Sequence, residues 1–431
     1  MRSEFIVQKK NLEKWAKDLF PLNRSLTGLG NRKTLNYIKK NINKNISIKS
    51  VRSNTKVFSW TIPQEWHVNY AKLLDKNKKV ISDFKRNNLE LLGYSTKIKK
   101  KIKYNELKNH LYFNKERPNA IPYVTSYYKK NWGFCIPFNK FKNLKKNDSY
   151  YVDISTKLFN GKMNYGEIFI KGQSKKEILI CTYICHPSMA NNELSGILVA
   201  SLISTKIKKT KYSLRIIFIP ETIGAIYYIK KNLKHLKKNL VAGFNLSCVG
   251  LPGKINIIKT IYENSYVDKV CERLSLRNKD IKLLSFLKRG SNERQFGCQN
   301  LYLPFVTICT KRFGDFKEYH TSDDNLDILN FNTIIKVTNF VKKIVKEINE
   351  NDIYIKNSYC EPFLSGKKII EPIASIKNQT LSERISMQNF LAYTNKSNDL
   401  KSLSKMLAIS TKYLKEISNK LLKHKIIKKY I

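Results

Sequence analysis

Strand-length apolar runs and helical repeats alternate through the middle of the chain, from about residue 150 to residue 350. The runs with the composition of buried strands are 177–185, 212–219, 241–249 and 302–309. Apolar residues recur at helical spacing over 194–207 and 334–348. This alternation predicts an α/β fold, a three-layer sandwich with helices on both sides of a mostly parallel sheet. Ligands bind at the carboxyl ends of the strands in such a sheet, so the residues after each strand are candidates for function.

Two regions before this segment have different patterns. In residues 1–57, Leu12, Trp15 and Leu19 recur at helical spacing and predict an opening helical layer. Residues 58–150 are rich in aromatic residues and prolines, and their short apolar segments are separated by turn signals. This composition predicts a separate β-rich lobe rather than long helices.

The last segment, residues 365–431, has the pattern of a small helical module. Residues 399–407 and 411–422 predict two short helices joined by a turn, and 423–431 could form a wing strand. A helix-turn-helix of this kind could bind DNA, or it could serve for docking to a partner or for self-association. Because the second helix has no arginine, it offers few base-reading side chains, and we favour the docking role.

The charge of the chain at first suggests a nucleic-acid partner. Lysine and arginine number 81 against 33 acidic residues, which gives a net charge of +48. However, most of these cations are lysines, and they are spread along the whole chain rather than gathered on one element. Nucleic-acid readers usually favour arginine. The charge is better explained by the lysine-rich, asparagine-rich composition that an AT-rich genome produces at tolerant positions.

The compartment is predicted from apolar runs and cysteines. No run approaches the roughly 20 apolar residues of a membrane span. Charged residues occupy the N-terminal positions where a signal peptide would have its apolar centre. The 8 cysteines form no regular framework, as in proteins whose thiols stay reduced. We therefore expect a cytoplasmic protein without a membrane span.

Candidate catalytic residues lie where predicted strands end. His186 directly follows the run 177–185, Glu221 follows 212–219, and His320 lies shortly after 302–309. Glu293 lies on a glycine-containing turn, Gly290-Ser-Asn-Glu. Two imidazoles and two carboxylates at one sheet edge could bind zinc and activate water. Each residue alone could also have a structural role, such as capping a helix or completing a loop.

The segment Cys185-His-Pro-Ser-Met-Ala-Asn-Asn-Glu-Leu-Ser-Gly resembles the metal-binding loop of zinc-dependent aminopeptidases, in which an Asp-Asn-x-Ser-Gly motif follows a histidine. More closely, the chain resembles a bacterial family of aminopeptidase-like proteins that are often associated with surface-polysaccharide biosynthesis. The phrases that carry this resemblance include Arg24-Ser-Leu-Thr-Gly, Ile121-Pro-Tyr-Val-Thr-Ser-Tyr-Tyr and Glu318-Tyr-His-Thr-Ser. The resemblance implies an aminopeptidase-like domain formed by 1–57 and 151–355, an inserted domain over 58–150, and a C-terminal winged helix over 365–431.

The resemblance also implies roles for single residues. His186 and His320 match metal ligands, and Glu221 matches the general base. The bridging aspartate of the dizinc enzymes falls at Asn192, and a second metal-binding glutamate falls at Thr222.

A further metal-binding aspartate of the dizinc enzymes falls at Asn292. Because amides and a hydroxyl cannot balance four positive charges, we expect one divalent metal instead of two. Zn²⁺ is the first expectation, with Mn²⁺ or Fe²⁺ as alternatives. The expected ligands are His186 and His320, with oxygen atoms from Glu293, Asn192 or Asn292.

The resulting hypothesis is a mononuclear metallohydrolase that cleaves an amide or peptide bond near a free amine. Its substrate would be a small aminoacyl, peptide or amino-sugar amide, and Tyr127, Tyr128 and Trp132 of the lobe would bind it. One alternative is a non-catalytic binding or regulatory protein that keeps the pocket. Another is a nucleic-acid-binding protein that acts through the C-terminal module.

Overall fold

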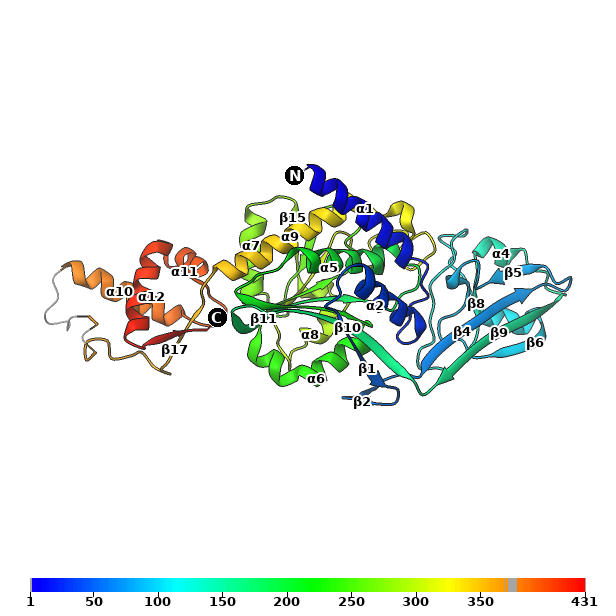
Figure 1. The fold of residues 1–431 in the computed structure, drawn as a ribbon, viewed down its shortest axis with the longest axis horizontal. Coiled ribbons are helices and arrows are strands. Elements are labelled where there is room, and N and C mark those ends of the chain that lie inside the picture. Colours follow the sequence, from blue (N-terminus) through cyan, green and yellow to red (C-terminus); the bar gives the residue numbers. More distant parts are fainter. Residues whose placement is uncertain (1, 368, 371–377, 431) are drawn as a thin grey trace.

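The computed structural model describes residues 2–367, 369–370 and 378–430 (Figure 1). A large sheet with helices on both faces forms the main domain. Figure 1 shows a smaller β-rich lobe at one end of this domain and a helical module, which we call the tail module, at the other.

The main sheet has eight strands in the described part of the chain. At its centre β11 pairs in parallel with both β12 and β13, and β13 pairs in parallel with β16. The mostly parallel α/β sandwich predicted from the sequence is therefore confirmed. In spatial order the strands are β1 (Ser47–Arg52), β10 (Lys162–Ile170), β12 (Tyr212–Ile219), β11 (Ser174–Tyr183), β13 (Leu240–Leu246), β16 (Phe305–Cys309), β14 (Ile255–Ile258) and β15 (Ile281–Leu284).

Helices cover both faces of this sheet. Apolar side chains from one set of helices pack with the strands in the largest buried cluster. This set consists of α1 (Arg2–Leu19), α2 (Leu29–Asn41), α5 (Ser195–Lys206), α7 (Tyr266–Leu276) and α9 (Phe331–Glu350). The opposite face is covered by α6 (Ile223–Asn239) and the short α8 (Glu293–Phe296), which form a second buried cluster with the strands.

Three predicted strands begin or end at other residues than expected. β13 ends at Leu246 rather than at residue 249. β11 ends at Tyr183 rather than at residue 185, so the two residues before His186 belong to the loop. β16 begins at Phe305 rather than at residue 302. Tyr302 has a φ of 46°, and Pro304 has no N–H for a strand ladder, so neither residue extends the strand.

The inserted lobe contains a four-stranded antiparallel sheet in the order β5-β4-β9-β6. Its last strand, β9, runs from Ser149 to Phe159, across the border expected at residue 150. The lobe's elements are β4 (Glu65–Leu74), β5 (Val80–Asp83), β6 (Ile98–Lys103), α3 (Tyr104–Leu107), β7 (Leu111–Tyr112), β8 (Phe134–Cys135), α4 (Phe138–Lys142) and β9. A short hairpin, β2 (Lys56–Val57) with β3 (Trp60–Thr61), precedes them.

The tail module contains the two short helices predicted from the sequence, as α11 (Leu400–Leu407) and α12 (Thr411–Lys423). It also contains α10 (Asn378–Tyr393), and β18 (Ile427–Lys429) pairs with β17 (Tyr354–Lys356). Part of the segment expected to form a winged helix, residues 371–377, lies outside the described residues, and the winged-helix assignment stays a prediction.

A buried ion pair fixes the tail module to the main domain. Asp399 is fully buried, and its carboxylate accepts hydrogen bonds from Arg273 on α7 at 3.1 and 2.5 Å. The same carboxylate caps α11 by accepting from the Ser402 N–H at 2.8 Å. One side chain therefore both begins a helix of the tail and connects it to the sheet domain.

No helix in the described ranges is long and apolar enough to cross a membrane. The cytoplasmic location stays a prediction.

We expect Asp399→Ala to destabilise the tail module by roughly 3 kcal/mol, because it removes a helix cap and leaves Arg273 with only its longer ion pair to Glu347, at 3.6 Å. Hydrogen exchange across α11 and α12, together with urea denaturation, measures this effect. Asp280→Ala is the matched control, since Asp280 forms only an exposed pair with Lys336. Unchanged exchange in Asp399→Ala would contradict this role.

Candidate active site

A cavity of about 370 Å³ opens beside the carboxyl ends of β11 and β12, between the main domain and the inserted lobe. Its volume is that of a small-molecule site. The residues that line it are Leu26, Trp60, Tyr123, Thr125, Tyr127, Tyr128, Cys185, His186, Glu221, Thr222, Ile223 and His320. All three candidate residues that follow predicted strands belong to this lining: His186, Glu221 and His320.

The His186 ring lies between two carboxylates, Glu193 on one side and Glu221 on the other. Its Nδ1 atom lies 3.1 Å from Glu193 Oε2, and its Nε2 atom lies 3.9 Å from Glu221 Oε2. Burial by itself would lower the pKa of His186, but the hydrogen bond to Glu193 and the two carboxylate charges outweigh it and raise the pKa. Because Nδ1 is engaged, Nε2 is the atom that remains for a ligand in the cavity.

Glu193 is fully buried and is neutralised by several donors. Its Oε2 atom accepts the N–H of His186 at 2.6 Å and the N–H of Cys185. Its Oε1 atom accepts from Arg24 Nε at 2.5 Å, and neither side chain is exposed. Arg24 also donates from Nη1 to the Leu19 carbonyl at the end of α1, at 2.6 Å.

The sequence interpretation missed Arg24 and Glu193 as site residues. The Arg24-Ser-Leu-Thr-Gly phrase stands in a glycine-containing loop and contributes the charge that balances Glu193. A signal was present, because Glu193 occupies the asparagine position of the Asp-Asn-x-Ser-Gly motif. The chain thus has Asn192-Glu193 where the motif has aspartate followed by asparagine, so the carboxylate is moved by one residue.

The loop after His186 enters α5 through a π-helical turn over Ala190–Leu194. Asp324 holds this turn, since its carboxylate accepts the N–H groups of Asn191 at 2.6 Å and Asn192 at 2.9 Å. Burial raises the pKa of Asp324 to about 6, although these N–H groups oppose the shift. The turn directs Glu193 back toward the histidine.

Glu221 lies in the short segment between β12 and α6. Its Oε1 atom accepts a hydrogen bond from the Ser291 hydroxyl at 2.5 Å. Burial raises the pKa of Glu221, while the neighbouring His186 and the serine hydrogen bond oppose that rise. A carboxylate whose pKa is raised in this way is suited to accept a proton and return it.

The position of His320 is set by its own strained backbone and by a hydrogen bond from the inserted lobe. Its φ is 55°, and its ring stacks on Tyr319 with centroids 3.9 Å apart. The lobe pairs with this segment, since the Tyr123 N–H donates to the His320 carbonyl at 2.8 Å. The ring centre lies 5.5 Å from that of His186.

The Nε2 atom of His320 is buried and has no hydrogen-bond partner. Burial, with a smaller contribution from His186, lowers the pKa of His320 to about 3, so the imidazole is neutral. A neutral buried imidazole with a free nitrogen beside a second histidine fits a divalent metal. His186 and His320 are the donors that could hold it, and the Glu221 carboxylate lies beside them.

A second group near the cavity, Cys185, His186 and Glu193, has ligand atoms within 4.8 Å of one another. It fits a metal less well, because both oxygens of Glu193 are already bonded to Arg24 and to backbone N–H groups. Burial also raises the pKa of the Cys185 thiol well above its usual value, which keeps the thiol protonated.

Glu293 does not reach the cavity. Its Oε1 atom accepts the N–H groups of Gly290 at 2.5 Å and Ser291 at 2.9 Å, and its Oε2 atom accepts from Thr307 Oγ1 at 2.7 Å. The carboxylate is fully buried and holds the turn that presents Ser291 to Glu221. These contacts leave it no free position for a metal in this structure.

The two asparagines expected to supply oxygen atoms also lie outside the lining. Asn292 Oδ1 accepts the Thr222 N–H at 2.9 Å, and its amide nitrogen donates to Cys181 Sγ at 3.5 Å. Asn192 is buried, and its amide nitrogen has no partner. Asn292 therefore shapes the Thr222 backbone, where φ is 59°.

Of the three residues expected to bind substrate, two line the cavity and one does not. Tyr127 and Tyr128 line the cavity, whereas Trp132 stacks on His110 with centroids 3.7 Å apart inside the lobe and does not reach it. Trp60, on the hairpin before the lobe, occupies the rim instead. The sequence indicated an aromatic-rich lobe but could not tell which rings face the site.

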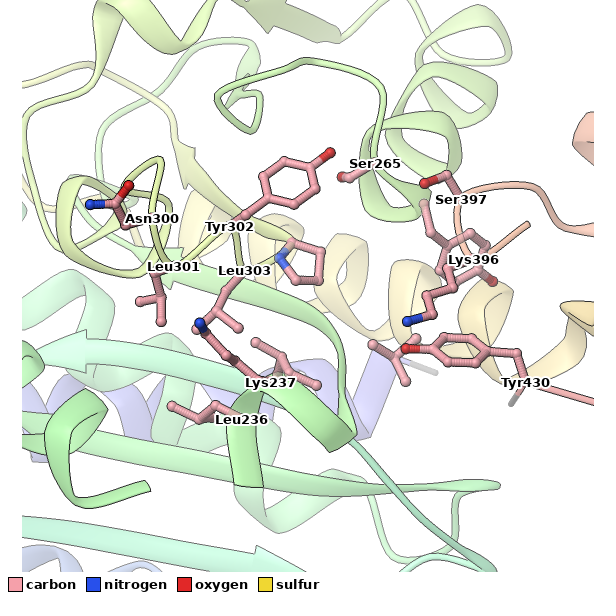
Figure 2. Close-up of a pocket in the computed structure, with 14 residues that line it drawn as sticks. Leu236, Lys237, Ser265, Asn300, Leu301, Tyr302, Leu303, Lys396, Ser397 and Tyr430 are labelled. Carbon is pink, nitrogen blue, oxygen red and sulfur yellow. The ribbon is translucent and has the colours of Figure 1, made fainter. Parts of the chain in front are cut away.

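A second cavity of about 430 Å³ lies between the main domain and the tail module, with Tyr302 and Lys237 on one side and Lys396 and Tyr430 on the other (Figure 2). None of the residues that line it is a histidine or a carboxylate. The candidate residues His186, Glu221 and His320 line the first cavity and not this one.

We expect Arg24→Met to destabilise the protein by roughly 3 to 5 kcal/mol, because the buried charge of Glu193 would lose the guanidinium group that balances it. Adding Glu193→Gln to it should recover part of this loss. Chemical denaturation of the two variants measures both effects, with Arg312→Met, which breaks a more exposed pair, as the control. An equal loss in Arg24→Met and Arg312→Met would contradict the buried pair's role.

Comparison with known proteins agrees with this architecture. The family described as domain of unknown function DUF4910 matches residues 13–351. A *Clostridium acetobutylicum* relative with the provisional name polysaccharide biosynthesis protein with aminopeptidase-like domain is 39% identical over 363 residues, covering 83% of this chain and 82% of the relative.

Solved structures show the same fold. A crystal structure of a provisionally named peptidase from *Clostridium acetobutylicum* is 33% identical, covers 99% of both chains and has a TM-score of 0.78. A zinc aminopeptidase from *Bacillus subtilis* is 13% identical, covers 79% of this chain and 94% of its own, and has a TM-score of 0.59. The chain belongs to the DUF4910 family, and its main domain has the aminopeptidase-like fold.

Proposed function

We propose that this protein is a metal-dependent hydrolase that cleaves an amide bond in the cavity formed by His186, Glu221 and His320. The observation that carries the proposal is the buried, unpartnered Nε2 atom of His320, which lies beside a second histidine and a carboxylate. The zinc aminopeptidase from Bacillus subtilis among the structural neighbours supports a divalent metal, with zinc as the first candidate.

The metal would be held by His186 and His320, with Glu221 near by. When bound, it would polarise the carbonyl group of the substrate as a Lewis acid. Glu193 holds His186 in the tautomer that directs Nε2 to the cavity. The lobe holds His320 in place through the Tyr123 backbone.

Glu221 is proposed as the proton carrier. Its carboxylate would take a proton from the attacking water and give it to the nitrogen that leaves. The Ser291 hydroxyl fixes one of its oxygens, so the other, Oε2, is free to face the reacting groups. The name of the relative supports a role in polysaccharide metabolism.

A second candidate is a binding or regulatory protein without catalytic activity. It is favoured by the neutral residues Asn192, Thr222 and Asn292 at positions where the dizinc enzymes have carboxylates. Metal content and turnover separate the two candidates.

Purified protein should contain roughly one equivalent of zinc, manganese or iron after each metal is offered and the excess removed. Elemental mass spectrometry should show that His186→Ala/His320→Ala loses this metal. His235→Ala, which changes an exposed histidine on α6, should retain it. Equal metal content in the double variant and the control would remove the two histidines from the metal site.

Glu221→Gln should lower turnover of an amide substrate by about 10²- to 10⁴-fold while the metal content stays unchanged, because the general base is lost. Glu416→Gln on α12 provides a control for the loss of one surface carboxylate. The assays are release of a primary amine and elemental analysis of the same samples. An active Glu221→Gln protein would show that another group is the base.

A further inference from the structure

Glu221 is the single carboxylate among the residues that line the site cavity. Glu193 lies behind His186, and its charge is balanced by the buried guanidinium of Arg24. Glu293 is buried with hydrogen bonds to both of its oxygens. The cavity therefore has one negative group to offer a ligand, and the proposed hydrolysis needs that group as its base.

This charge pattern disfavours a substrate with a free amine beside the cleaved bond. An α-amino group has a pKa of about 8 and is largely charged at neutral pH. Removing such an ammonium from water costs several kcal/mol unless a carboxylate pairs with it. If Glu221 formed that pair, it could not take the proton from water.

Neutral residues also stand where the aminopeptidases have additional acids. Asn192, Thr222 and Asn292 carry no charge, and Thr222 is part of the cavity lining. The carboxylate of Glu193, one residue after the aspartate position of the aminopeptidase motif, lies behind His186 as seen from the cavity. It is already paired with Arg24. The negative field that would attract an ammonium group is therefore reduced at this site.

Aromatic rings at the rim provide the other contact surface. Trp60 is 39% exposed and Tyr128 is 56% exposed, and their rings meet edge to face with centroids 6.0 Å apart. The Tyr128 hydroxyl donates to the Thr61 carbonyl at 3.0 Å, which ties this ring to the hairpin that carries Trp60. A sugar ring can lay its C–H face on such rings while its hydroxyl groups stay in water.

We propose that the cavity takes an N-acylated amino sugar, with the neutral amide beside Glu221 and the sugar ring against Trp60 and Tyr128. This inference rests on the proposed hydrolase function and names its substrate class. It replaces the free amine expected from the resemblance to aminopeptidases with an uncharged amide.

The reaction would be a hydrolysis without any redox step. The water oxygen bonds to the acyl carbon, and the bond between this carbon and the sugar nitrogen breaks. Glu221 takes one proton from the water and transfers it to that nitrogen. The products are the free amino sugar and the carboxylic acid, which ionises in water.

Binding to metal-loaded Glu221→Gln protein tests the substrate class without turnover, and the free amines and leucinamide are also titrated into metal-loaded wild-type protein, which keeps the one carboxylate that could pair with an ammonium group. Isothermal titration should compare N-acetylglucosamine, N-acetylgalactosamine and N-acetylmannosamine with the three corresponding free amino sugars and with leucinamide. We expect at least one acetylated sugar to bind about tenfold or more tightly than its free amine and leucinamide. Trp60→Ala should weaken this binding about tenfold, and Tyr70→Ala, an exposed lobe ring outside the lining, should not.

Tighter binding of leucinamide, no binding of any acetylated sugar, or binding that is unaffected by Trp60→Ala would overturn the substrate assignment. The wild-type protein is tested in parallel for acetate release from the sugar that binds. Binding without acetate release would instead refute the hydrolase function on which this inference rests, and would favour the non-catalytic candidate. The two failures are therefore distinguishable.

Discussion

The Glu193 carboxylate is buried away from solvent, and two other segments of the chain supply the groups that stabilise its charge. Arg24 comes from the loop after α1, the Cys185 and His186 N–H groups come from the loop after β11, and the imidazole of His186 completes the set. Because an unpaired buried charge is costly, these contacts fix the relative position of α1, the strand end and the π-helical turn. The orientation of His186 is a direct result.

The same arrangement determines what the cavity can hold. Paired with Arg24, Glu193 adds no net charge, and the Nε2 atom of His186 is left facing Glu221. His320 supplies a second ring nitrogen, on a neutral imidazole, and the inserted lobe holds this residue in place through the Tyr123 N–H. One divalent metal suits the two imidazoles, with the Glu221 carboxylate left beside them as the base, whereas two metals would need the acids that Asn192 and Asn292 replace. The lobe then adds aromatic rings instead of charge.

Much of the fold could be predicted because the apolar runs of the central strands are long and unbroken. The existence and order of these strands could be predicted from the runs, whereas the last residues of β11 and β13 differ from the prediction by two or three positions. The structure brings His186, Glu221 and His320 to one cavity, and their roles stay predictions. Glu293 has the same local signals, but its oxygens are saturated by the turn and by Thr307, a contact visible only in three dimensions. Arg24 and Glu193 were missed because their pairing spans 169 positions of the chain.

The most direct test of the account is anomalous X-ray diffraction at the zinc edge from crystals grown with zinc. The account predicts one anomalous peak between the imidazoles of His186 and His320, with the Glu221 carboxylate next to it. Two peaks at this site would contradict the single-metal centre. A peak against Cys185 and Glu193, or no peak in the cavity, would contradict the assignment of the two histidines as the ligands.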